Sequence, residues 1–219
     1  DDTKSYLSDW HDRFHGAAYA VVLPESTEQV SAIMAYADTN NIVVVPQGGN
    51  TGFMGGATPD KRGNTILLSM RRMNSVREFD RKNMSMTVEA GCILQNLQDV
   101  AEDAGLYFPL NLAAKGSCTI GGNLGTNAGG LNVVRYGTTR ALTLGLEVVL
   151  IGGEVLDMLS GLRKDNTGYD LRDLFIGSEG TLGIITAATM RLFPKPVAVS
   201  TAFAEVRDVD AAVELLHRL

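Results

Sequence analysis

The hydrophobic and polar residues of this 219-residue chain follow two different periods, which together predict an α+β fold. Apolar residues at helical spacing over Val30–Ala37 follow Ser26 and Thr27, which are typical N-cap residues, so we expect an amphipathic helix there. A second helix is predicted over Leu94–Ala104, closed by Gly105. Runs of apolar and β-branched residues predict strands at Ala20–Leu23, Ile42–Val45, Thr65–Ser69, Ser75–Phe79 and Ser85–Glu89. The strand at Ile42–Val45 is expected to be buried.

The pattern further along the chain predicts antiparallel strands. Gly145–Ile151 and Glu154–Leu159 flank a turn of two glycines, which is typical of a β-hairpin. Leu182–Leu192 predicts another pair of strands.

The character of the chain changes after Pro196. Ala198–Val206 alternates like a strand, and Val209–Leu219 has the spacing of a helix, but neither has an evident partner in the sequence. We therefore expect residues 1–195 to form the main domain and residues 196–219 to be the truncated beginning of another.

Composition narrows the class of protein. The chain is 45% hydrophobic and 20% charged, which supports a folded core, and its net charge of −6 argues against nucleic acid or an anionic membrane as the main partner. It contains no uninterrupted apolar run of about 18 residues, so we expect no membrane-spanning helix. Cys92 and Cys118 do not form a CxxC pair, and we expect free thiols in the cytoplasm, with peripheral attachment to an inner membrane as a variant of that location.

Two glycine-rich segments carry the strongest chemical signal. The first is Pro46–Gly52, directly after a predicted strand, and the second is Gly116–Gly130. Glycine lets the backbone approach a ligand closely, and successive N–H groups in a tight loop form a concave site for an anion such as phosphate. The sequence therefore predicts a diphosphate held from both sides, against the alternative of two tight turns without a ligand.

Other sequence signatures are absent or weak. The chain has no GxGxxG, no GxxxxGK[ST] and no GxSxG, which argues against a Rossmann dinucleotide site, a P-loop and the simplest serine hydrolase. His11 and His15 lie four residues apart, but no third ligand is evident, so we favour a solvated N-terminal helix over a metal site. Cys118 lies inside the second glycine-rich segment and is expected to be a packed, inert thiol.

A third segment of polar residues and glycines, Arg163–Leu171 followed by Leu174–Ile185, precedes the last predicted strands. Taken together, the three segments resemble the PCMH-type FAD-binding domain of the vanillyl-alcohol-oxidase-type family of FAD-linked oxidases. The resemblance runs from about Ala17 to Pro194. It is closest to the D-2-hydroxy-acid branch, which includes D-2-hydroxyglutarate dehydrogenase, D-lactate dehydrogenase and the FAD subunit of glycolate oxidase.

This resemblance implies an α+β fold of two subdomains with FAD between them, and a C-terminal substrate or cap domain that begins at residue 196. It also implies which residues bind the cofactor. The pyrophosphate would be held by Pro46, Gln47, Gly48, Gly49, Asn50, Thr51 and Gly52 and by Gly121, Gly122, Asn123, Thr126, Asn127, Ala128 and Gly129. The flavin and ribityl side would be lined by Pro109, Leu110, Gly116, Ser117 and Thr119, and the adenosine or ribityl part by Gly180, Ile184 and Ile185.

The mode of FAD attachment follows from one position of the first segment. Many members of the family attach FAD covalently through a His in the pattern Arg-x-Gly-Gly-His, where this chain has Asn50. An amide cannot be the nucleophile that forms this bond. Cys118 is out of register with the Cys of members that use a second tether. We therefore expect non-covalent FAD.

The resemblance implies an oxidoreductase that converts a D-2-hydroxy acid to the 2-oxo acid by hydride transfer to flavin N5. In this branch the catalytic base, the metal ligands and the residues that hold the substrate lie in the C-terminal domain, so we expect no catalytic and no metal-binding residue in this chain. The electron acceptor is unknown. Two alternatives remain: another enzyme of the family, such as an alditol oxidase or a reductase of cell-wall precursors, and a non-catalytic nucleotide-binding module.

Overall fold

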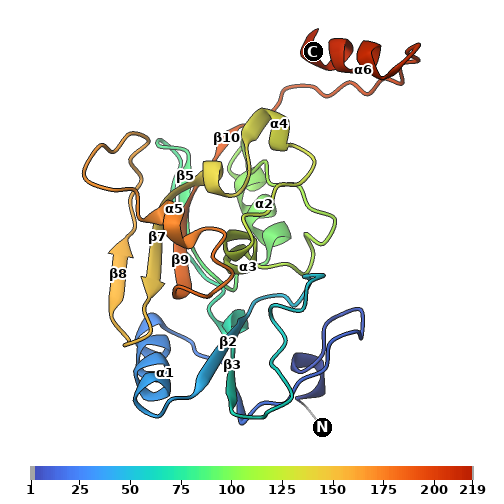
Figure 1. Ribbon diagram of the computed structural model, residues 1–219. Coiled ribbons are helices and arrows are strands. Elements are labelled where there is room, and N and C mark those ends of the chain that lie inside the picture. The colour runs from blue at the N-terminus through green and yellow to red at the C-terminus, as the bar shows by residue number, and fades with distance from the viewer. Residues whose placement is uncertain (1–2, 219) are drawn as a thin grey trace.

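Two sheets with different strand directions form the frame of the protein in this computed structural model, which describes residues 3–218 (Figure 1). The strands are β1 (Ala20–Val22), β2 (Val43–Gln47), β3 (Thr65–Ser69), β4 (Val76–Asp80), β5 (Ser85–Glu89), β6 (Leu106–Tyr107), β7 (Thr143–Val149), β8 (Val155–Met158), β9 (Ile184–Arg191) and β10 (Phe193–Pro194). The helices are α1 (Thr27–Thr39), α2 (Leu94–Asp103), α3 (Ile120–Gly125), α4 (Val133–Tyr136), α5 (Arg172–Phe175) and α6 (Val209–Arg218), with short 3-10 turns at Lys4–Tyr6, Met70–Arg72 and Arg140–Leu142.

The smaller sheet is parallel and has the strand order β1-β3-β2. Helix α1 connects β1 to β2, and the Ser26 hydroxyl caps it by accepting the N–H of Gln29, as the sequence predicted. The expectation that the strand from residue 42 is buried is wrong. Because β2 lies at the edge of the sheet, the Val43 side chain is 44% exposed.

The larger sheet is antiparallel and has the strand order β4-β5-β9-β7-β8. The predicted hairpin is present as β7 and β8, and Gly153 takes the positive φ of 92° that its turn requires. The prediction of a strand pair over Leu182–Leu192 is wrong, because this stretch forms one long central strand, β9. The chain then continues into β10, which pairs with β6 in a separate two-stranded sheet.

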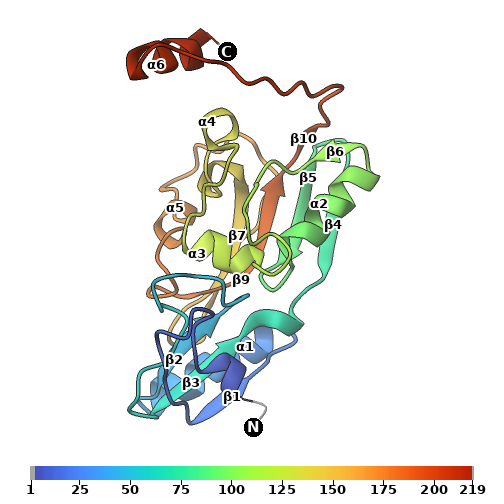
Figure 2. The ribbon, with the colours of Figure 1, turned by 90° about the vertical axis from the view of Figure 1, so that its right-hand side faces the viewer.

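Helices α2 and α3 cover one face of the larger sheet, as Figure 2 shows. Leu94, Leu97 and Ala101 of α2 and Ile120 and Leu124 of α3 are buried in the main hydrophobic core. This burial is what holds α3 in place, since its sequence is rich in glycine, which is a poor helix former.

A second, smaller core joins the two sheets. It contains Val30 and Met34 of α1, Leu68 of β3, and Val149 and Ile184 of the larger sheet. The α+β fold with two subdomains, one on each sheet, is therefore confirmed.

A buried polar network lies at the same joint. The Glu147 carboxylate accepts hydrogen bonds from the hydroxyls of Thr27 and Thr186, each at 2.7 Å. Arg77 adds an ion pair to Glu147 at 3.0 Å. Because Thr27 begins α1 while the other three residues belong to the larger sheet, this network ties the two subdomains together.

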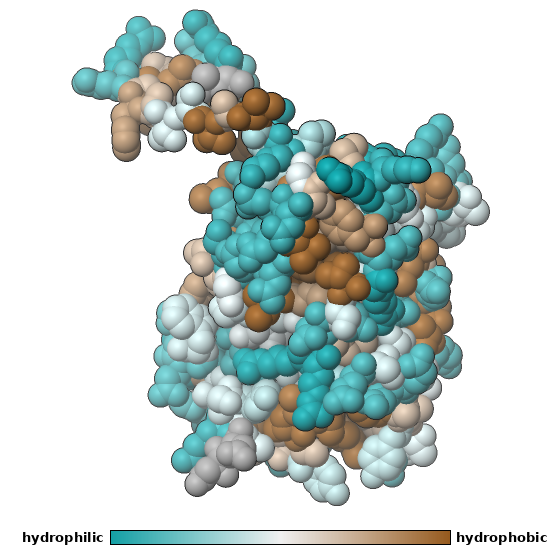
Figure 3. Space-filling view, turned by 180° about the vertical axis from the view of Figure 1, so that it is seen from behind, coloured by the Kyte–Doolittle hydropathy of each residue, from teal (hydrophilic) through white to brown (hydrophobic). Residues whose placement is uncertain are grey.

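The C-terminal residues stand apart from the rest of the molecule. Residues 196–208 run away from the body as an extended chain, and α6 follows at its end (Figures 1 and 2). The prediction of a strand over Ala198–Val206 is wrong, because within residues 3–218 the segment has no neighbouring strand with which to pair. The predicted helix is present as α6, with Leu219 outside the described residues, and Figure 3 shows apolar side chains on its surface.

Candidate functional site

The first two glycine-rich segments touch each other. The first begins in the last two residues of β2, and the second enters α3 through Thr119, which forms a β-bridge with Ile93. A Cβ atom added to Gly49 would lie 2.0 Å from the carbonyl oxygen of Ser117, and one added to Gly48 would lie within 3.0 Å of the Thr119 hydroxyl. Only glycine permits this approach, so these positions are required for the two segments to meet.

The third segment closes the group. The N–H of Gly177 donates to the Leu124 carbonyl, and that of Glu179 donates to the Gly125 carbonyl, each at 2.9 Å. Gly180 has a φ of 77°, and a Cβ there would lie within 3.0 Å of the Pro46 ring. The three segments, residues 46–52, 117–125 and 177–180, thus form one structure, which we call the glycine cradle.

The cradle offers hydrogen-bond donors without protein partners. Within residues 3–218, none of the backbone N–H groups of Gly49–Gly52 donates a hydrogen bond to another backbone or side-chain group. Within the same residues 3–218, the Thr119 hydroxyl and the Asn123 amide nitrogen are buried without a hydrogen-bond partner. A Cβ atom at Gly52 would meet open space. Buried donors of this kind fit an anionic ligand such as a diphosphate, which would satisfy them.

The side chains of Gln47 and Asn50 point elsewhere. The Gln47 amide, which is 1% exposed, donates to the carbonyls of Tyr6 and Ala57 at 2.9 Å. The Asn50 amide donates to the Ser8 carbonyl at 2.8 Å. Both side chains are therefore engaged by neighbouring protein, and the backbone N–H of Asn50 is left for a ligand.

The remainder of the second segment is held by internal contacts. The Asn127 side chain accepts the N–H of Arg140 at 3.0 Å, and the guanidinium of Arg140 donates to the carbonyls of Asp173 and Ile176 at 2.6 Å. Arg140 thus joins the second segment to the third. No sequence signal marked this residue, because it lies in an ordinary turn outside the glycine-rich segments.

Five further predicted cofactor residues divide into two groups. Gly116 and Ser117 are exposed, and a Cβ at Gly116 would meet open space. Leu110, Ile184 and Ile185, in contrast, place their side chains in the two hydrophobic cores. These three residues can therefore present only backbone groups to a cofactor.

The two cysteines are buried and free. Burial raises the pKa of the Cys92 thiol to about 11 and also raises the pKa of the Cys118 thiol. Because the thiolate is the reactive form, both residues have the properties of packed, inert thiols.

The histidines near the N-terminus do not lie on a helix, so that part of the prediction is wrong. Ser8 and His15 form a β-bridge instead, and the His11 ring lies 4.1 Å from the Trp10 ring, centroid to centroid. Among residues 3–218 no three His, Cys, Asp or Glu side chains form a group able to hold a metal ion.

Within residues 3–218, no helix has the length and hydropathy to cross a bilayer.

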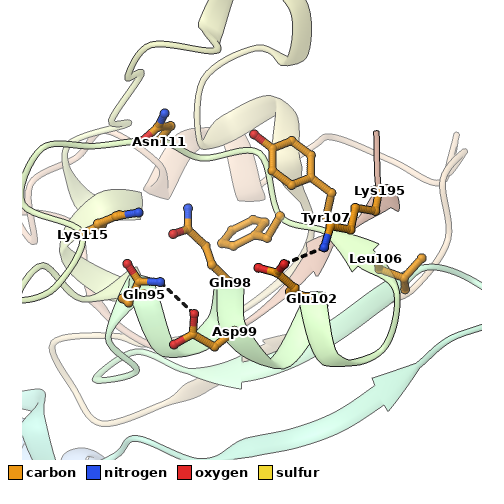
Figure 4. Close-up of a pocket in the computed structure, with 10 residues that line it drawn as sticks. Gln95, Gln98, Asp99, Glu102, Leu106, Tyr107, Asn111, Lys115 and Lys195 are labelled. Atoms are coloured by element: carbon orange, nitrogen blue, oxygen red, sulfur yellow. Dashed lines mark hydrogen bonds and ion pairs between the residues drawn. The ribbon is translucent and has the colours of Figure 1, made fainter. Parts of the chain in front are cut away.

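A polar pocket of about 200 Å³ lies beside α2 (Figure 4). Its lining includes Asn111 and Lys115, which precede the exposed Gly116, and the carboxylates of Asp99 and Glu102. Glu102 forms an ion pair with Lys195 on one side of the pocket, at 2.5 Å. Lysines and carboxylates line it together, so it lacks the uniformly positive or amide-lined character of a diphosphate site.

Curated relatives share most of the chain. It is 48% identical over 208 residues to "Probable D-2-hydroxyglutarate dehydrogenase, mitochondrial" of Oryza sativa, with 95% of this chain and 37% of that protein covered. It is 51% identical to D-2-hydroxyglutarate dehydrogenase of Danio rerio, with 91% and 37% covered, and 41% identical to that of Stutzerimonas stutzeri, with 99% and 46% covered. The chain therefore spans less than half the length of these relatives.

The expected cytoplasmic location is wrong. The relatives from Oryza sativa, Danio rerio and Bos taurus are all named as mitochondrial. The prediction rested on free thiols, which do not distinguish one reducing compartment from another.

Solved structures and a family description agree with this similarity. The fold superimposes on an alkyldihydroxyacetonephosphate synthase with a TM-score of 0.73 at 29% sequence identity, over 81% of this chain and 32% of that one. Residues 18–159 match the family described as "FAD binding domain". The resemblance drawn from the three glycine-rich segments is confirmed, FAD is the cofactor, and the chain belongs to this family of FAD-binding domains.

Proposed function

We propose that this chain is the FAD-binding part of an enzyme that oxidises a D-2-hydroxy acid, of the 2-hydroxyglutarate, lactate or glycolate class, to the 2-oxo acid. The relatives named D-2-hydroxyglutarate dehydrogenases support this reaction. Because the chain spans 37% of the length of the relatives from Oryza sativa and Danio rerio, we assign the activity to a protein of their length and FAD binding to this chain.

The glycine cradle is the observation that carries the proposal. Bound FAD supplies a hydride acceptor, and the chain supplies its position. The N–H groups of Gly49–Gly52 bind the pyrophosphate, with the Thr119 hydroxyl and the Asn123 amide as neighbouring donors. The cradle contains no Lys or Arg, so amide dipoles balance the phosphate charge, which lets an acidic protein bind an anionic cofactor.

We propose that FAD is bound without a covalent bond. Asn50 stands where many members of the family carry a nucleophilic His, and its amide is already hydrogen-bonded to Ser8. Cys118, the other candidate, is buried with a raised thiol pKa. Neither side chain is a competent nucleophile toward the flavin.

Residues 196–219 are assigned to the start of the substrate-binding domain. Helix α6 supports the assignment, because Val209, Val213 and Leu216 are exposed although they are apolar. Such a face is typical of a helix that packs against further protein. The catalytic base and the groups that hold the substrate belong to that domain.

The test is to purify the chain, add FAD, remove free FAD by gel filtration, and precipitate the protein with acid. We expect about one flavin per chain before precipitation and all of it in the acid supernatant. Flavin that stays in the pellet would refute non-covalent binding. A chain that retains no flavin would refute the cradle as an FAD site.

A further inference from the structure

The first residues of the chain form a small hairpin against the first glycine-rich segment. Ser8 and His15 pair across it, and the N–H of Gly16 donates to the Leu7 carbonyl at 2.8 Å. At its tip the Asp9 carboxylate accepts the N–H groups of Arg13 and Phe14, each at 2.7 Å. We call residues 7–16 the N-terminal hairpin. Its own hydrogen bonds give it a defined shape without a long strand or a helix.

Two amide side chains of the first segment reach back to this region. Asn50 donates to the carbonyl of Ser8, within the hairpin, and Gln47 donates to the carbonyl of Tyr6, directly before it. Both acceptors are backbone groups. The contacts therefore depend on the fold of the hairpin and on the two amide donors.

The chain beyond the cradle is tied to the same hairpin. The Arg13 guanidinium donates to the carbonyl of Phe53. The Phe14 ring lies against Gly55, where a Cβ atom would come within 3.0 Å of it. The first glycine-rich segment is thus attached at its start to the residue before the hairpin, and at its middle and just after its end to the hairpin itself.

The segment needs this support because it has little of its own. The N–H groups of Gly49–Gly52 make no hydrogen bond that would fix the shape of the segment within the described part of the chain. Asn50 also holds a φ of 54°, a conformation that is uncommon outside glycine. A loop that is ordered before its ligand arrives binds more tightly, because less conformational entropy is lost on binding.

We propose that Gln47 and Asn50 are positioning residues, which hold the first segment against the N-terminal hairpin so that the N–H groups of Gly49–Gly52 are arranged for the pyrophosphate. The inference rests on FAD binding in the glycine cradle, as proposed above. It assigns to these side chains a role that does not involve contact with FAD.

The experiment compares FAD affinity in variants of two asparagines that share one backbone conformation. Asn50 and Asn41 have φ angles of 54° and 53°, and Asn41 lies at the opposite end of β2 from the cradle. Asn50→Gly removes the amide but keeps the backbone conformation, and we expect about 5-fold weaker binding of FAD. Asn50→Asp places a carboxylate against the Ser8 carbonyl, and we expect at least about 10-fold weaker binding. Asn41→Gly and Asn41→Asp should bind FAD like the unaltered chain.

The ³¹P NMR spectrum of bound FAD provides a readout that a general loss of stability would not move. At saturating FAD, we expect shifted pyrophosphate resonances in Asn50→Gly and unshifted ones in Asn41→Gly. Gln47→Met, which removes two amide hydrogen bonds without burying a charge, should act like Asn50→Gly. Equal affinity and identical spectra for Asn50→Gly and the unaltered chain would overturn the inference while leaving the FAD site intact. Failure of the unaltered chain to bind FAD would overturn both.

Discussion

Replacing Gly49 by alanine tests the contact between the first two glycine-rich segments. The added Cβ would lie 2.0 Å from the Ser117 carbonyl oxygen, where real Cβ contacts are not shorter than 3.0 Å. The other nearby atoms, the Ser117 carbonyl carbon and the Cys118 Cα, also belong to the backbone and cannot rotate away. The two segments must therefore separate by about 1 Å, which in packed protein costs about 1–3 kcal/mol.

The same movement misplaces the donors for the pyrophosphate. Loss of two hydrogen bonds to a charged group, at about 1.5 kcal/mol each, corresponds to roughly 100-fold weaker binding of FAD. Urea unfolding of the chain without FAD measures the first effect, and titration of FAD by flavin fluorescence measures the second. Gly116→Ala, whose Cβ meets nothing within 4 Å, is the control for stability. A Gly49→Ala variant with unchanged stability and FAD affinity would refute the close contact.

Three further predictions concern stability and reactivity. Glu147→Ala should lower the free energy of unfolding by about 2 kcal/mol, because it removes the carboxylate that accepts from Arg77 and from two buried hydroxyls at the joint of the sheets, while Arg77 keeps its ion pair with Glu89. Urea unfolding would measure this, and a loss below about 1 kcal/mol would count against the network. The pKa of the Asp9 carboxyl is held below its ordinary value, first by the N–H of Phe14 and against the effect of burial. The Asp9 carboxylate should therefore stabilise the folded chain fully above about pH 4, and this stabilisation should be lost as the pH falls through the lower pKa of the folded state. The free energy of unfolding, measured between about pH 2 and 6, should depend less on pH in Asp9→Asn than in the unaltered chain. With a pKa of about 11, the Cys92 thiol should react with iodoacetamide at pH 8 at least about 100-fold more slowly than a free thiol until the protein unfolds, and fast alkylation of the native chain would contradict its burial.

Local signals in the sequence predicted most regular elements. The cap at Ser26, the hairpin that contains Gly153 and the helix that ends before Gly105 all depend on residues within a few positions of one another. Elements that depend on distant residues were missed. Helix α3 has a glycine-rich sequence that disfavours a helix, and it forms because its apolar side chains are buried against the larger sheet.

Burial and strand pairing could not be predicted from alternation alone. The β-branched run from Ile42 predicted a buried strand, yet β2 is at an edge and partly exposed, because strand order is a property of the whole sheet. Ala198–Val206 has the alternation of a strand but no partner within the described residues. A strand without a partner leaves its backbone groups to solvent, so the pattern alone does not make one.

The site shows the same division. Glycine clusters and their order along the chain predicted the segments that the fold brings together. The support from Ser8 to Asn50 spans 42 residues, and that from Arg140 to Ile176 spans 36, so no local pattern could have indicated either. The sequence therefore predicts the backbone segments that face the ligand, but not the side chains that hold these segments in place.

Binding of the FAD pyrophosphate by the glycine cradle is best tested by following the backbone amide resonances of the chain by NMR during titration with FAD. We expect the largest downfield shifts at the N–H groups of Gly49–Gly52, which lack protein acceptors in the described structure. Shifts should also appear at Thr119 and Asn123. Unchanged resonances at Gly49–Gly52, with the main shifts at Gln95 and Lys115 around the pocket beside α2, would contradict binding of the pyrophosphate by the cradle.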